Sequence, residues 1–176
     1  QKLVPTCPLK AGRAMKTDDV LGEVWYGPST FSADLLDLFT KPQAWSNTRK
    51  QVSTLNLPVQ MFNQDWPGWS KLQSVSAVKS WADSGGKLAI EAGAVKGYDC
   101  EGSGNMQAIL NAIDLIHAHD GKTHYVAFDE PLIAGTESRM AGGCNMTQNE
   151  TAHRVATIIK ELRGAPKSAE ISIGDI

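Results

Sequence analysis

The sequence predicts an α/β fold in which parallel strands alternate with helices. Five short segments have the apolar content of strands, and the longer segments between them carry apolar residues at helical spacing. This alternation is typical of parallel βαβ units, because two parallel strands need a long crossover between them. The chain has 176 residues, of which 41% are apolar and 20% charged, so it can form one domain with a substantial core.

The first two expected units follow an extended N-terminal segment at residues 1–17. The first strand is expected at residues 19–26 (DVLGEVWY), and a helix-like cluster comes after it: Leu35, Leu36, Leu38 and Phe39. The second strand is expected at residues 55–62 (LNLPVQMF). Helical spacing then recurs at four apolar positions, which are Leu72, Val75, Val78 and Ala82.

The other three expected strands lie at residues 87–95 (KLAIEAGAV), 123–128 (THYVAF) and 169–176 (AEISIGDI). The helix expected before the fourth strand has the clearest apolar stripe: Met106, Ile109, Leu110, Ile113 and Ile116. The last helix opens with a capping box, in which Thr147 and Glu150 are three residues apart. It is expected to end at Gly164, shortly before a proline.

Two parallel folds fit such units, a doubly wound sheet and a (β/α)8 barrel. The first strand is followed by Tyr26-Gly27-Pro28-Ser29, which lacks the glycine spacing of a nucleotide-binding loop. We therefore predict a TIM-type barrel. Because a whole barrel takes about 250 residues, we expect residues 1–176 to form a single partial barrel domain with the first five βα units. This interpretation implies a partner, either the remaining half of the barrel or a second chain.

Polar or aromatic side chains stand at the end of every expected strand. In parallel α/β proteins the carboxyl ends of the strands meet at one edge, where ligands bind. The residues expected there, in strand order, are Glu23, Trp25 and Tyr26; Gln60 and Asn63; Glu91 and Tyr98; Asp129 and Glu130; and Asp175. Gathered carboxylates cost desolvation energy unless each has a partner or a function. The sequence therefore predicts a functional site at this edge.

The fourth strand ends in a tripeptide with a specific resemblance. A buried strand, Tyr125-Val126-Ala127-Phe128, is followed directly by Asp129-Glu130-Pro131. This tripeptide at the end of a fourth strand resembles the Asn-Glu-Pro signature of clan A glycoside hydrolases, which are (β/α)8 barrels. The resemblance implies that Glu130 is the general acid/base and that Asp129 contacts the sugar next to the cleaved bond. In that clan the nucleophile lies on a seventh strand, beyond the five expected here.

Glycoside cleavage needs one protonated carboxyl to donate to the leaving oxygen and one carboxylate to attack or to activate water. Glu130 is the expected acid, and three carboxylates would support it: Asp129, Glu91 and Asp175. The candidates for stacking on sugar faces are aromatic: Trp25, Tyr26, Trp66, Trp69 and Tyr98. Gln60 and Asn63 would add hydrogen bonds to the substrate. The expected substrate is a carbohydrate, and this chemistry needs no cofactor.

Two alternatives stay open. Glu91, Glu130 and Asp175 could converge on Mg²⁺ or Mn²⁺, as in a sugar isomerase or lyase on a TIM barrel. No histidine stands at an expected strand end, so the hydrolase is preferred. In the other alternative the acids only pair with bases, and the protein is a non-catalytic sugar-binding or assembly module.

Charge and cysteine content bear on partners and compartment. The net charge is -2, with acids and bases interleaved, which gives no sign of a nucleic-acid or membrane partner. Two glycosylation sequons, starting at Asn145 and Asn149, favour a secreted or periplasmic protein. Cys100 and Cys144 follow the third and fourth strands, which are adjacent in either parallel fold. If the protein is secreted, we predict a disulfide between them.

Overall fold

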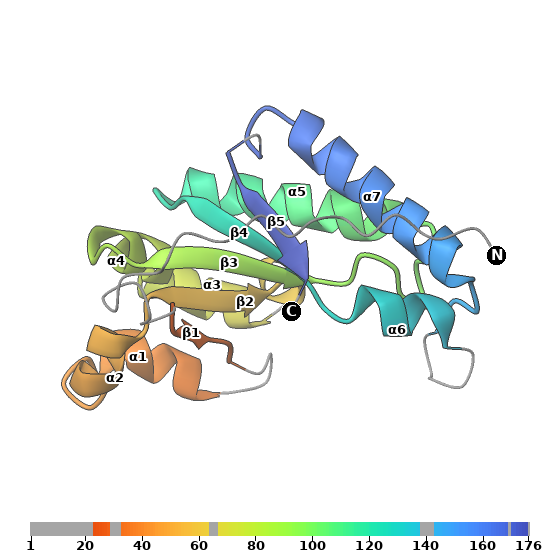
Figure 1. Ribbon diagram of the computed structural model, residues 1–176. Helices are drawn as coiled ribbons and strands as arrows, with labels where there is room; N and C mark the ends of the chain where they lie inside the picture. Colours follow the sequence, from red (N-terminus) through yellow and green to blue (C-terminus); the bar gives the residue numbers. More distant parts are fainter. Residues whose placement is uncertain (1–22, 29–32, 64–66, 138–142, 169, 176) are drawn as a thin grey trace, which may run out of the picture.

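The structure, a computed structural model, describes residues 23–28, 33–63, 67–137, 143–168 and 170–175, without the side chains of residues 33, 34, 67, 68 and 175. The N-terminal segment expected at residues 1–17 therefore lies outside the described residues. The described chain forms one parallel sheet whose strands are connected by helices (Figure 1). The predicted α/β fold of parallel βα repeats is confirmed.

Five strands follow one another across the sheet in chain order, and every neighbouring pair is parallel. They are β1 (Trp25–Tyr26), β2 (Thr54–Pro58), β3 (Lys87–Ala92), β4 (Thr123–Phe128) and β5 (Ser172–Asp175). The order does not reverse anywhere among these described strands, whereas a doubly wound sheet reverses at its switch point. Consecutive order is the arrangement found in the wall of a (β/α)8 barrel.

The connections are mostly helical. The short 3₁₀ helices are η2 (Ala33–Leu36) and η3 (Val59–Phe62). The α-helices are α1 (Asp37–Thr40), α2 (Ser46–Gln51), α3 (Pro67–Ser74), α4 (Ala77–Asp83), α5 (Ser103–Ala118), α6 (Pro131–Thr136) and α7 (Gln148–Gly164). Of these, α5 packs on β3 and β4, and α7 lies beside α5 (Figure 1). No described helix is long and apolar enough to cross a membrane.

The core lies between the sheet and these helices, because alternate strand residues point to opposite faces. Leu57 on β2 and Ile90 on β3 are 2% and 0% exposed, and they belong to the same buried cluster as Ile109 of α5 and Leu162 of α7. Leu57 and Ile90 are also register partners, so they share one face of the sheet. On each of these strands, the residues that alternate with the buried ones point to the other face of the sheet.

The sheet curls toward this second face. Trp25 on β1 and Tyr125 on β4 place their ring centroids 5.0 Å apart, although two strands separate them. In a flat sheet the two strands would be roughly 14 Å apart. The ring contact follows from curvature, as in a barrel wall.

Four expected strands are shorter than the sequence suggested, and one expected helix is divided. Within the described residues the first strand spans only Trp25–Tyr26, the third ends at Ala92 rather than residue 95, and the fifth spans Ser172–Asp175. The second strand ends at Pro58 rather than residue 62, because proline has no N–H to continue the ladder, and η3 follows. The single helix expected around Leu72 to Ala82 is two helices, α3 and α4. Ser76 stands between them with φ 49°, a left-handed backbone conformation that interrupts an α-helix. Residues 123–128 form β4 as predicted.

The disulfide between Cys100 and Cys144 is present, with 5.6 Å between the two Cα atoms. It connects the segment before α5 to the segment before α7, and it closes a loop of 44 residues. Closing such a loop lowers the entropy of the unfolded chain.

Removing the disulfide tests this contribution. We expect Cys100→Ser/Cys144→Ser to lower the free energy of unfolding by about 2–4 kcal/mol, measured by urea denaturation. As a control, a thiol titration of the denatured, unreduced wild type should find at most one free thiol, because the sequence has three cysteines and two of them are paired. Three free thiols would show that the bond does not form.

The contribution of the capping box at the start of α7 to stability can also be tested. The Thr147 N–H donates to Glu150 Oε2 over 2.7 Å, and the Glu150 N–H donates to Thr147 Oγ1 over 3.2 Å. The pKa of Glu150 lies below its ordinary value. The hydrogen bond from the Thr147 backbone N–H is the largest cause, and the bond from the Thr147 hydroxyl is the second. A carboxyl whose pKa is lowered on folding stabilises the folded state at pH values above its unfolded pKa. This stabilisation is lost as the pH falls through the folded pKa.

We therefore expect Glu150→Ala to reduce the free energy of unfolding at pH 7 and the difference from wild type to shrink in acid, measured by denaturation at several pH values. Glu161, an exposed glutamate of the same helix, supplies the control variant Glu161→Ala. Equal pH dependence in the two variants would contradict the prediction.

Candidate functional site

One carboxylate lies on the concave face of the sheet, opposite the core. Glu91 on β3 alternates with the buried Ile90 and Ala92, so its side chain points away from the helices. Asn56 on β2 points the same way, and its Nδ2 donates to Glu91 Oε2 over 2.6 Å. Asn56 is 5% exposed, which makes this amide a fixed support for the carboxylate. The other amide oxygen, Asn56 Oδ1, is buried without a hydrogen-bond partner among the described residues.

A second carboxylate belongs to Asp129, directly after β4. Its backbone N–H donates to the Ala92 carbonyl over 3.0 Å, so the ladder between β3 and β4 extends one residue past the strand. Its side chain accepts a hydrogen bond from Lys96 Nζ over 2.9 Å. The Lys96 side chain is only 19% exposed, so this ion pair is partly shielded from solvent. The pairing of Asp129 with a lysine at the end of the neighbouring strand holds the two strand ends together.

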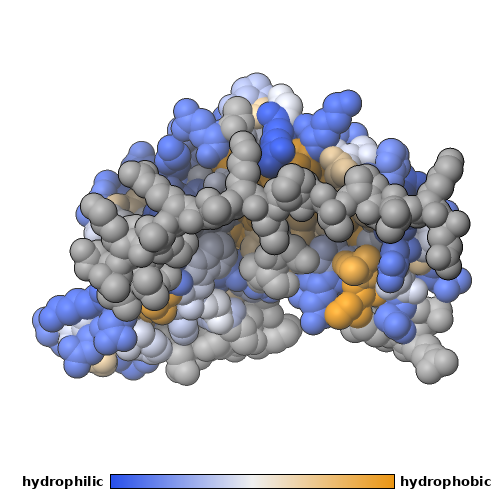
Figure 2. All heavy atoms as spheres, viewed as in Figure 1, coloured by the Kyte–Doolittle hydropathy of each residue, from blue (hydrophilic) through white to orange (hydrophobic). Residues whose placement is uncertain are grey.

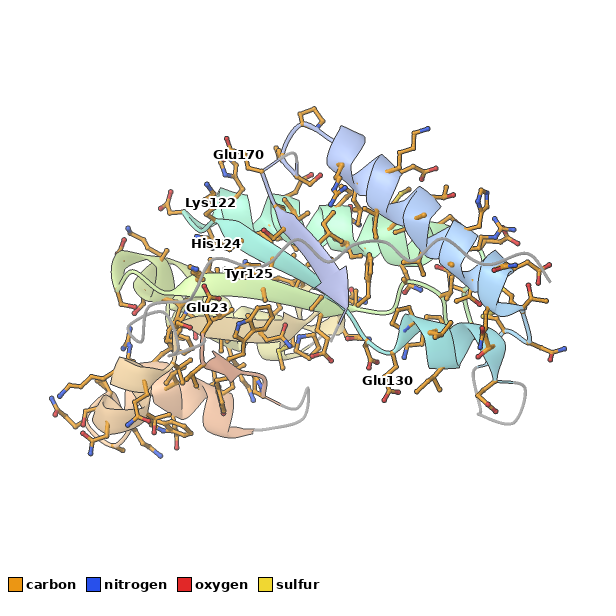
Figure 3. The ribbon with its side chains drawn as sticks, viewed as in Figure 1. Glu23, Lys122, His124, Tyr125, Glu130 and Glu170 are labelled. Carbon is orange, nitrogen blue, oxygen red and sulfur yellow. A yellow bond between two sulfur atoms is a disulfide. The ribbon has the colours of Figure 1, made fainter. Side chains whose placement is uncertain are left out.

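The third carboxylate, Glu130, has an unusual backbone. Its φ of 45° and ψ of 47° are left-handed, a conformation that costs a residue with a Cβ ~1–2 kcal/mol. The backbone is held there because Asp129 still pairs with β3 while Pro131, which is buried, begins α6. The Glu130 side chain is exposed at the start of α6 (Figure 3). Local strain of this kind often marks functional positions.

Apolar residues lie next to Glu130 at the surface. Leu132 and Ile133 in α6 are 49% and 46% exposed, and Figure 2 shows the apolar patch over this helix. A sugar ring has apolar C–H faces as well as hydroxyl groups. The patch therefore offers an apolar surface within one helical turn of the carboxylate.

Three of the expected substrate-binding residues are close together, on the helical side of the sheet. Gln60, Asn63 and Tyr98 line an open groove between η3 and α5. Tyr98 is 72% exposed. Desolvation at the groove raises the pKa of its phenol, nearby Lys96 lowers it, and Asp99 and Asp129 raise it further.

The residues of the first strand do not lie where the sequence suggested. Glu23 and Trp25 were expected at the carboxyl ends of the strands. Trp25 instead pairs with Thr54, the first residue of β2, and contacts Tyr125. Glu23 precedes β1 and accepts hydrogen bonds from Lys87 Nζ, at the start of β3, and from the Tyr125 hydroxyl. These residues therefore form a cluster toward the strand starts. In Figure 3 two of its members, Glu23 and Tyr125, lie far from Glu130.

The electrostatics of this cluster are those of an ion pair. The hydrogen bond from Lys87 lowers the pKa of Glu23, and the same bond raises the pKa of Lys87. The nearby imidazole of His124 has its pKa lowered by desolvation and then by Lys122. Mutual pairing of Glu23 and Lys87 explains both of their shifts. The cluster fastens β1 to β3 and β4.

Three further aromatic residues and one further acid were expected at the site: Trp69, Tyr26, Trp66 and Asp175. Trp69 was expected to stack on sugars, but it is 4% exposed in the core, packed on Phe62 with 5.4 Å between ring centroids. Its ring is almost fully buried there, so it does not offer an open stacking surface to a sugar. Tyr26 is half-buried with its ring 5.9 Å from that of Trp45. Trp66 and the side chain of Asp175 lie outside the described residues.

Parallel pairing brings Glu91, Asp129 and Glu130 to the ends of the neighbouring strands β3 and β4. Sequence reasoning missed Asn56, although a polar residue between Leu55 and Leu57 in an otherwise apolar strand was a usable signal.

In the described part of the chain, no three His, Cys, Asp or Glu side chains form a cluster that could hold a metal ion. Comparison with protein-family models, curated proteins and solved structures found no match.

The bond between Asn56 and Glu91 can be tested by Asn56→Asp. This change removes the donor and places a second carboxylate against Glu91, so we expect the free energy of unfolding to fall by about 2–3 kcal/mol at pH 7. The loss should be smaller in acid, where one of the two carboxylates takes up a proton. Asn47→Asp, at an exposed position in α2, is the matched control. Equal urea denaturation curves for the two variants would contradict the assignment.

Proposed function

We propose that this chain belongs to a carbohydrate-active hydrolase that cleaves glycosidic bonds by carboxylate acid/base catalysis. The observation that carries the proposal is Glu130. It is a glutamate held in a left-handed backbone conformation, directly after the fourth parallel strand and directly before a buried proline. The sequence Asp129-Glu130-Pro131, which resembles the clan A signature, thus coincides with a strained and exposed carboxylate at a strand end.

In this proposal Glu130 donates its proton to the leaving oxygen of the glycosidic bond. Glu91 is the supporting carboxylate from the neighbouring strand, and the Asn56 amide orients it. Asp129, held by Lys96, contacts the sugar beside the cleaved bond. Leu132 and Ile133 offer an apolar surface to the ring.

The same proposal extends to the architecture. The five strands form one sector of a (β/α)8 barrel, which is supported by their consecutive order and by the curvature that joins Trp25 to Tyr125. A second carboxylate must attack the anomeric carbon as the leaving group departs, or activate a water molecule that does so. It comes either from Asp175 on β5 or from strands other than these five, in the same polypeptide or in a second chain.

We also propose that the protein works in an oxidising compartment, outside the cell or in the periplasm. The disulfide between Cys100 and Cys144 supports this assignment, because cytosolic reductants keep most thiols reduced. Asn145 and Asn149, the two sequon asparagines, are both exposed, as glycan acceptors must be.

A second candidate function is sugar binding without catalysis. It is favoured by the fact that two of the three carboxylates already have protein partners, Asp129 with Lys96 and Glu91 with Asn56. Such a module would bind carbohydrate without cleaving it.

Glu130→Gln separates the two functions. It keeps the size of the side chain and removes the titrating proton, so we expect glycosidic cleavage to fall about 10²–10⁴-fold while the unfolding curve stays unchanged. Cleavage is measured on the complete barrel, with the strands that complete it present in the same polypeptide or a second chain, as new reducing ends from a panel of soluble polysaccharides.

Glu137→Gln is the matched control, because Glu137 is an exposed glutamate at the other end of α6. It should retain full activity. Full activity in Glu130→Gln would exclude Glu130 as the acid, and carbohydrate binding without cleavage by the wild type would favour the binding module.

A further inference from the structure

The groove between η3 and α5 has the size of a ligand site. Its volume is about 840 Å³, within the usual range for small-molecule sites. Gln60, Asn63 and Tyr98 contribute from the loops after β2 and β3, and Asn105 and Asn111 contribute from α5. Four of these five side chains are amides, each of which can both donate and accept hydrogen bonds.

Asn105 is the most informative lining residue. It stands four residues before Ile109, on the stripe of α5 that otherwise packs into the core, where an apolar side chain is expected. It is 6% exposed, and its Nδ2 has no hydrogen-bond partner among the described residues. An amide buried without a partner costs about 1–3 kcal/mol. The helix start does not need this side chain, because Asp99 Oδ2 already accepts from the Asn105 backbone N–H over 2.7 Å.

The charges around the groove favour a neutral ligand. No Lys or Arg is among the described residues that line it, so nothing there would neutralise a phosphate or a carboxylate. The one acidic lining residue, Asp114, is already paired with Lys167 over 2.7 Å. The other lining groups are neutral: the amides, the Tyr98 ring and the apolar surface of Phe62 and Leu115. This combination suits a polyhydroxylated ring, with hydroxyl groups on its edge and C–H groups on its faces.

From these observations we propose that the groove is a second carbohydrate-binding site, for neutral oligosaccharides, on the helical side of the sheet. It is distinct from the strand-end carboxylates, because Glu91 and Asn56 point to the opposite face from α5. The proposal does not rest on catalysis by Glu130, since a protein without hydrolase activity could still bind sugar in this groove. For an enzyme, a site beside the strand-end edge would hold a long chain close to its carboxylates.

The test uses two variants. Ala108→Trp fills the groove from a half-buried position on α5, and Asn105→Leu replaces the buried amide by an apolar side chain of similar size. The probes are neutral hexasaccharides of glucose, xylose, mannose and N-acetylglucosamine, with binding measured by isothermal titration calorimetry. We expect the wild type to bind at least one of them, and each variant to bind it at least about tenfold more weakly.

Asn105→Leu also distinguishes a ligand-binding role from a structural one. If Asn105 serves a ligand, the leucine removes a buried amide Nδ2 that has no partner among the described residues, so the variant should be as stable as the wild type or more stable while binding is lost. A loss of stability together with binding would show that Asn105 is structural, and Ala108→Trp alone would then decide. Asn47→Leu, at an exposed helical position, is the control and should bind normally.

Two results would overturn the proposal. One is a wild type that binds none of the neutral probes, or that binds inorganic phosphate in their place. The other is binding that survives Ala108→Trp but is abolished by Glu91→Gln, which would assign all sugar contacts to the strand ends. The proposed function is tested by the cleavage activity of Glu130→Gln, and the groove is tested by hexasaccharide binding to Ala108→Trp and Asn105→Leu, so the failure of one proposal is distinguishable from the failure of the other.

Discussion

Consecutive parallel pairing of the five strands is the constraint on which the rest of the structure depends. A strand that returns beside its predecessor in the same direction needs a crossover, and right-handed crossovers in a constant order place the helices on one face. The apolar side chains of the sheet are then buried on that face, as Leu57 and Ile90 are. The other face is free to carry polar residues such as Asn56 and Glu91. The same pairing brings the ends of β3 and β4 together.

The strand ends show how this regular framework holds an irregular position. Asp129 continues the ladder through its backbone and pairs with Lys96 through its side chain. Pro131 is buried and begins α6. Glu130 lies between two fixed neighbours, so its left-handed backbone is imposed by the tertiary structure at a local cost of ~1–2 kcal/mol. Its carboxylate is presented to solvent beside an exposed apolar patch, and this combination underlies the proposed acid/base role.

The sheet also separates the two proposed ligand sites. Glu91 and Asn56 belong to the concave face, whereas Gln60, Asn63 and Tyr98 line the groove beside α5. Asn56 and Glu91 belong to β2 and β3 themselves, and the groove residues Gln60, Asn63 and Tyr98 follow the ends of the same two strands. A carbohydrate chain held in the groove would approach the carboxylates from outside the sheet. The disulfide from Cys100 to Cys144 ties the loop after β3 to the segment before α7 and so braces this edge.

The sequence by itself determined the features that depend on neighbouring residues. Period and composition predicted the parallel α/β class, β4 at residues 123–128 and the capping box at Thr147, and the adjacency of successive strands predicted the disulfide. Only the tertiary structure decided which partner each side chain meets. It buried Trp69, paired Trp25 with the strand starts and joined Asn56 to Glu91. These contacts join residues distant in sequence, and their geometry depends on sheet register and curvature, which local pattern does not encode.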